Sequence, residues 1–135
     1  MAGYQACRRT FLGTADQVSE ARRFVTDHLA AAPEELLFLA ELVASELATN
    51  AVTHTRSGEP GGVFQIAVEL RPAESICITA YDEGSTSHVI PHSAAEDEES
   101  GRGLAIIETL AMQWGVVTTP GRHGVYCELD WQTKR

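Results

Sequence analysis

The sequence predicts an α/β protein of the α+β type: a two-layer sandwich in which a mainly antiparallel, mixed sheet of about five strands carries three helices on one face. Three observations support this fold class. Residues 64–71 and 76–80 alternate between apolar and polar side chains, as half-buried strands do. Apolar residues within 18–29 and 36–51 recur at helical spacing. The turns between successive strands are short, which favours antiparallel hairpins with the helices gathered on one side.

The first half of the chain is expected to form one strand and two helices. The strand covers residues 4–12, and Thr14 and Gln17 have the spacing of a capping box that would begin the first helix. Pro33 suits the first turn of a second helix, which is expected to end near His54. Apolar residues mark the buried side of this second helix: Leu36, Leu39, Val43, Leu47 and Ala51.

The second half is expected to begin with a hairpin of two strands, at 64–70 and 76–80, joined at Pro72–Ser75. Residues 84–100 show no periodicity, and a loop of this length in a compact domain is usually functional or mobile. A third helix is expected over Leu104–Ala111 and a strand over Trp114–Thr118. Gly121–Gly124 then forms a turn into a last strand, marked by Val125–Trp131.

Composition restricts the class of protein. The 135 residues allow one domain, 1–135, with one core. A net charge of −9 argues against direct nucleic-acid binding and fits either a basic protein partner or simple solubility. The cysteines, Cys7, Cys77 and Cys127, lack metal or redox spacing and are expected to be buried thiols. The sequence shows no signal peptide and no apolar run that suggests a membrane span, so we expect a cytoplasmic protein with no membrane contact.

A carboxylate and a carboxamide lie four residues apart in the otherwise apolar second helix. These are Glu46 and Asn50, and residues at this spacing point to the same side of a helix. A polar rim on an amphipathic helix would explain them without any chemistry. The alternative is that they form part of a binding site.

A second acidic residue closes a strand. Asp82 has the same alternation as Ile76, Ile78 and Ala80, so it is expected to face the helices, where a carboxylate needs a hydrogen-bond donor. The exocyclic amine of adenine is such a donor, whereas guanine has a carbonyl at that position and would be rejected. Asp82 could instead cap the turn at Gly84, whose missing side chain allows a close backbone approach.

A glycine-rich segment, Gly101-Arg102-Gly103-Leu104, lies at the expected start of the third helix. Free backbone N–H groups and the helix dipole bind phosphate at such a place, and Arg102 could add a positive charge. An ordinary glycine-rich junction between loop and helix is the alternative. The acidic run 96–99 directly before it would repel phosphate unless it turns outward or meets a partner.

These three segments, in this order, resemble the GHKL ATPase/kinase superfamily with its Bergerat ATP-binding fold, and most closely its bacterial anti-sigma factor serine/threonine kinase branch. The resemblance implies ATP and Mg²⁺ as cofactors, Asn50 as the magnesium ligand and Glu46 as the general base. It also implies nucleotide contacts from Asn50, Asp82, Gly84 and Gly101–Leu104. Thr86 stands where the family often has a second glycine.

The function expected from this resemblance is phosphorylation of a serine or threonine on an anti-sigma-factor antagonist, with alternative binding to a sigma factor, commonly as a homodimer. The loop at 84–100 would then act as a lid. Other readings remain open. The chain could be a non-catalytic ATP-binding module that controls a partner by binding, a detached sensor histidine-kinase catalytic domain, or a degenerate relative that no longer binds nucleotide.

Overall fold

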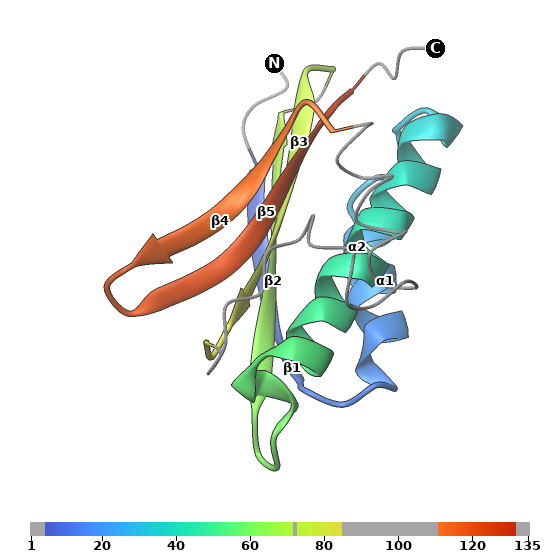
Figure 1. The fold of residues 1–135 in the computed structure, drawn as a ribbon. Coiled ribbons are helices and arrows are strands. Elements are labelled where there is room, and N and C mark those ends of the chain that lie inside the picture. Colours follow the sequence, from blue (N-terminus) through green and yellow to red (C-terminus); the bar gives the residue numbers. More distant parts are fainter. Residues whose placement is uncertain (1–4, 72, 85–110, 132–135) are drawn as a thin grey trace, which may run out of the picture.

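The computed structural model describes residues 5–71, 73–84 and 111–131. Within them, five strands form one antiparallel sheet in the order β1-β2-β3-β5-β4 (Figure 1). This arrangement confirms the predicted α+β sandwich. The third predicted helix, most of the 84–100 loop and the proposed phosphate segment Gly101–Leu104 lie outside the described residues. The strands are β1 Gln5–Leu12, β2 Val63–Arg71, β3 Ser75–Asp82, β4 Gln113–Thr119 and β5 Arg122–Asp130.

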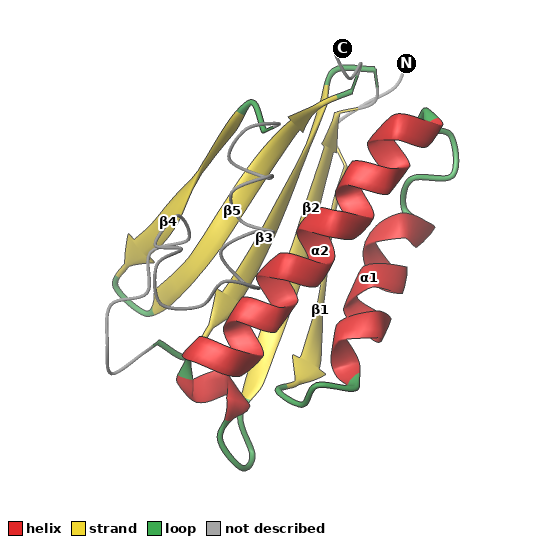
Figure 2. Ribbon diagram, turned by 45° about the vertical axis from the view of Figure 1, so that its right-hand side comes forward, coloured by secondary structure: helices red, strands yellow, loops and turns green. Residues whose placement is uncertain are grey.

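In the described part of the chain, two α-helices cover one face of this sheet (Figure 2). The first, α1, spans Gln17–Asp27, and the second, α2, spans Glu34–His54 and is followed by the short 3-10 helix η1, Arg56–Gly58. The core lies between the layers, where apolar side chains from α2 meet those of the central strands. Its largest fully buried side chains include Phe11, Phe64, Leu36, Leu47, Ile66, Ile76, Ile78 and Leu129.

Strand register decides which side chains face the helices. Ile78 lies opposite Val68 on β2 and opposite Cys127 on β5, and all three are buried beneath the helices. Because side chains alternate along a strand, Asp82 belongs to this same inner set. The sequence prediction that Asp82 faces the helix layer is therefore confirmed by the register.

The start of α1 differs from the prediction. The capping box was wrong, because Gln17 is the first helical residue and no side chain caps the helix. The carbonyl of Thr14 accepts a hydrogen bond from the Gln17 N–H instead, which makes residues 14–17 a turn. The Thr14 hydroxyl donates to the Asp16 carboxylate, so the side chain that was expected to cap the helix is already used within this turn.

Two expectations from composition also need correction. By length and composition alone, α2 would qualify as a membrane span, but in this fold its buried side packs against the sheet as the core helix. Cys127 is buried and Cys77 half-buried, whereas Cys7 is exposed because β1 is an edge strand whose first residues lie beyond the apolar core. Burial raises the pKa of Cys127 to about 12 and that of Cys77 to about 11, so both remain thiols near neutral pH.

Candidate functional site

Glu46 and Asn50 lie on one side of α2, as the sequence predicted, beside the buried residues Val43, Leu47 and Ala51. Asn50 is 8% exposed. Its Oδ1 atom is buried and has no hydrogen-bond donor in the described part of the chain. A buried carbonyl oxygen without a partner is unfavourable in a folded protein, and it suits a place where a ligand supplies the partner.

Glu46 lies one helical turn before Asn50 and is half-buried. Desolvation by burial raises the pKa of its carboxyl above the ordinary value. A raised pKa makes the carboxylate a stronger base near neutral pH, while leaving it able to ionise. The pair therefore combines a proton acceptor with an unpaired carbonyl oxygen on the same helical face.

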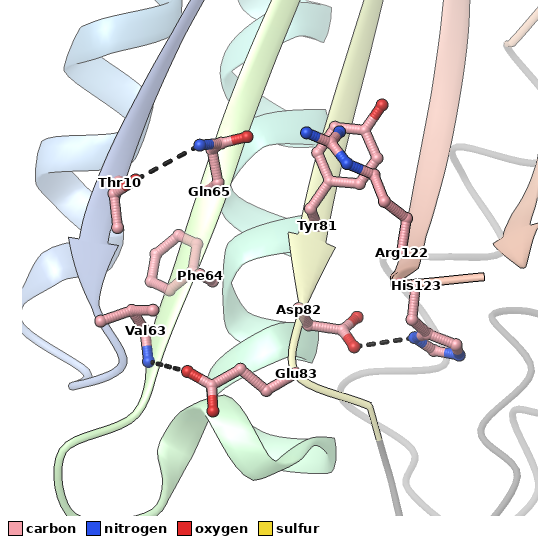
Figure 3. A pocket seen from close by; sticks show the side chains of 10 residues that line it. Thr10, Val63, Phe64, Gln65, Tyr81, Asp82, Glu83, Arg122 and His123 are labelled. Atoms are coloured by element: carbon pink, nitrogen blue, oxygen red, sulfur yellow. Dashed lines mark hydrogen bonds and ion pairs between the residues drawn. The ribbon is translucent and has the colours of Figure 1, made fainter. Parts of the chain in front are cut away.

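Asp82 closes β3, and its side chain is only 2% exposed. Its Oδ1 atom accepts a hydrogen bond from the Gly84 N–H at 2.7 Å and lies 2.7 Å from His123 Nδ1 (Figure 3). The turn cap that was one interpretation of Asp82 is therefore present. Both contacts use the same oxygen, so within the described residues the cap leaves Oδ2 able to accept another donor. Gly84 has a φ of 84°, a conformation that favours glycine.

The end of β3 is fastened to the end of α2. The Arg56 N–H donates to the Gly84 carbonyl at 2.7 Å, and the Glu83 N–H donates to Ser57 Oγ at 3.0 Å. Ser57 is completely buried, and it belongs to the 3-10 helix η1, which begins just after the end of α2. These bonds fix the position of Asp82 relative to the helix that carries Glu46 and Asn50. The site is therefore built from two elements joined at one end of the sandwich.

Two residues of this arrangement were missed from the sequence. His123 was assigned to the turn, whereas it is the second residue of β5 and lies directly opposite Asp82. Counting back by twos from Cys127 and Val125 would have placed it on the inner face. Ser57 was assigned to a glycine-rich turn, and its sequence gives no signal that its hydroxyl would be buried and accept a backbone hydrogen bond.

The open face of the sheet has a shallow hollow at the same end (Figure 3). The guanidinium of Arg122 lies 4.1 Å from the ring centroid of Tyr81, and Gln65 Nε2 donates to Thr10 Oγ1 at 3.3 Å. These side chains point away from the helices, because they alternate with the inner residues Asp82 and His123. The hollow thus opens on the face of the sheet away from the helices, and it extends to the end of β3 and β5, where Asp82, Glu83 and His123 also line it.

A metal ion at this site would need ligands other than the side chains of the described residues. Among the described residues, no group of three or more His, Cys, Asp or Glu side chains could hold a metal. One unpaired carboxamide oxygen does fit an ion such as Mg²⁺, which normally keeps several waters and takes its remaining ligands from phosphates. Asn50 therefore fits the role of a single protein ligand to a nucleotide-bound ion.

The family model of the histidine kinase-like ATPase domain matches residues 11–126. The chain belongs to this family. The match includes Glu46, Asn50, Asp82 and Gly84, and it confirms the GHKL-type superfamily that the sequence motifs suggested. The protein is accordingly an ATP-binding, histidine kinase-like module. No curated protein shows significant similarity to the chain.

Proposed function

We propose that this histidine kinase-like ATPase domain is a serine/threonine kinase of the anti-sigma type, which uses ATP and Mg²⁺ to phosphorylate an anti-sigma-factor antagonist protein. In this proposal it also binds a sigma factor, as a homodimer in the cytoplasm. The observation that carries it is the buried Asn50 Oδ1, which has no hydrogen-bond donor among the described residues and lies on the same side of α2 as Glu46. A purely structural helix face gains nothing from a buried carbonyl oxygen that lacks a donor.

Each side chain has a distinct part in this proposal. Asp82 accepts the exocyclic amine of adenine at Oδ2, because Oδ1 already accepts from Gly84 and contacts His123. Asn50 contributes its Oδ1 atom to the magnesium ion, which when bound neutralises charge on the triphosphate. Glu46 takes the proton from the attacking hydroxyl of the substrate, supported by its raised pKa.

The acidity of the chain supports the choice of a protein substrate over a nucleic acid. Its net charge of −9 disfavours contact with a polyanion and favours association with a basic surface. Three carboxylates near the start of α2, from Glu34, Glu35 and Glu41, are exposed around Phe38, whose side chain is 67% exposed. The helix that carries the catalytic pair thus also presents acidic residues and one aromatic side chain at its other end.

Incubation of the protein with Mg²⁺, ATP and candidate antagonist proteins, followed by intact-mass measurement, tests the proposal. The expected result is addition of one phosphoryl group to the antagonist, with loss of that addition in Glu46→Gln. Calorimetry with ATP in the same buffer separates the alternatives. ATP binding without transfer to any candidate would indicate a module that acts by binding alone. Absence of both binding and transfer would indicate a degenerate relative.

A further inference from the structure

His123 and Asp82 are opposite each other across β5 and β3, and both face the helix layer. Their contact at 2.7 Å is asymmetric in exposure: the Asp82 side chain is 2% exposed and that of His123 is 40% exposed. The histidine therefore reaches inward from the rim to a carboxylate that is almost fully buried. An ionised carboxylate can only accept hydrogen bonds, so His123 Nδ1 carries the proton and Nε2 is the second ring nitrogen.

The two donors to Asp82 act on one oxygen from different elements. The Gly84 N–H approaches from the turn that follows β3, and His123 Nδ1 approaches from β5. One donor leaves a carboxyl group free to tilt about that bond, whereas two donors from different directions fix its plane. Oδ2 is then held in one orientation. Preorganised acceptors of this kind give selectivity because they cannot move to suit the wrong ligand.

From this geometry we infer that His123 is a positioning residue for base recognition: by holding Asp82 at Oδ1, it presents Oδ2 to the exocyclic amine of adenine. The inference rests on the proposed function, since it deepens the role given to Asp82 there. It names a residue that the sequence motifs did not include. It also explains why a histidine stands on the inner side of β5, where the next three residues of the same set are apolar: Val125, Cys127 and Leu129.

A clasp, meaning a contact that only joins the ends of β3 and β5, would also explain the short distance. The test must therefore separate an effect on the orientation of Asp82 from an effect on the stability of the fold. A clasp changes the free energy of unfolding but leaves the preference for adenine over guanine unchanged. A positioning residue changes that preference. The position of the donor atom provides the decisive comparison, because the amide nitrogen of Asn lies close to where His Nδ1 lies, whereas that of Gln lies close to Nε2.

The experiment compares native protein with His123→Asn, His123→Gln and His123→Leu by calorimetry with ATP and GTP in the presence of Mg²⁺. His123→Asn is expected to keep the native ratio of ATP to GTP affinity. His123→Gln and His123→Leu are expected to lower this ratio by about tenfold or more, the usual effect of a lost hydrogen bond to a charged group. His28→Gln is the matched control, since His28 is also half-buried, with Nδ1 against the Phe24 carbonyl at 2.8 Å, and its ratio should not change.

The outcomes separate the inference from the proposal beneath it. If native protein prefers ATP and all three His123 variants keep that preference, His123 is only a clasp and the inference is overturned. Equal loss in the Asn and Gln variants would overturn it as well, because the donor position would not matter. If His123→Leu fails to fold, the Asn and Gln pair still decides. Native protein without any adenine preference overturns the proposed base contact itself, before any variant is considered.

Discussion

Asn50 offers a prediction in which function and stability change in opposite directions. Its Oδ1 atom is buried without a donor among the described residues, and the desolvation of such a group costs about 1–3 kcal/mol. Leucine has the same branching and the same number of side-chain heavy atoms as asparagine, with two bulkier methyl groups and no polar atom. Asn50→Leu should therefore increase the free energy of unfolding of the nucleotide-free protein by about 1–2 kcal/mol, which corresponds to roughly 3–7 °C in Tm for a domain of this size.

The assay has two arms. Urea denaturation in EDTA, followed by circular dichroism, measures the stability of the nucleotide-free protein. Calorimetry with ATP and Mg²⁺ measures binding, which should fall by about tenfold or more in Asn50→Leu because the proposed ion loses its protein ligand. Addition of ATP and Mg²⁺ should then raise the Tm of the native protein and leave that of the variant nearly unchanged.

Asn50→Asp is the control that keeps an oxygen ligand at this position. A second carboxylate four residues from Glu46 should make the nucleotide-free protein less stable, while magnesium-dependent binding is retained. The reasoning would be refuted if Asn50→Leu were clearly less stable than native protein, since Asn50 would then make a favourable contact in the free fold. Native affinity for ATP and Mg²⁺ in Asn50→Leu would equally remove Asn50 from the site.

Three further predictions concern the elements around the site. Glu46→Gln should keep ATP affinity and lose phosphoryl transfer. Because the pKa of Glu46 is raised in the folded protein, the free energy of unfolding of the native protein should fall as the pH rises through that pKa. Denaturation at a series of pH values should show the difference in stability between variant and native protein closing toward acidic pH. Gly124→Ala would place a methyl group 2.5 Å from a backbone carbonyl oxygen of β3 and should lower the free energy of unfolding by about 1–3 kcal/mol. Gly115→Ala would meet only a tyrosine ring, at 3.1 Å, and should lower it less. Equal Tm values for the two variants would contradict the close approach at Gly124. Ser57→Ala removes the acceptor of the Glu83 N–H and should lower the free energy of unfolding by about 1 kcal/mol and weaken ATP binding. Ser19→Ala, which removes an exposed hydroxyl, should change neither. Native ATP affinity in Ser57→Ala would show that the hydrogen bond from Glu83 does not hold the site together.

The elements that could be predicted from sequence are those in which side-chain periodicity is strong. The second helix, α2, ends at His54 as expected, because apolar residues at helical spacing continue until the glycine-rich turn. The first helix, α1, ends at Asp27, before the last apolar position that was expected in it, Leu29. The inner orientation of Asp82 followed from alternation along β3, which a packed sheet enforces. Glu46 and Asn50 share one side of α2 for the same geometric reason. Local periodicity therefore accounts for most of the fold and for three of the site residues.

What could not be predicted depends on contacts between segments far apart in the sequence. The contact of His123 with Asp82 joins residues 41 positions apart, and it exists only because β3 and β5 are neighbours in the sheet. The hydrogen bond from the Glu83 N–H to Ser57 likewise needs the end of α2 to meet the end of β3. The start of α1 failed for a local reason, since the Thr14 hydroxyl has a competing acceptor in Asp16.

The alternation of side chains at the end of β3 and β5 links the two faces of the sheet. Tyr81 and Arg122 stack on the open face, while the next residue of each strand, Asp82 and His123, meet on the inner face. A movement of one strand end against the other must change both contacts together. The Tyr81 ring, stacked against a guanidinium on the face away from the helices, is thus a natural optical reporter: its ultraviolet absorption, taken as the difference between native protein and Tyr81→Phe, should change with events at the carboxylate.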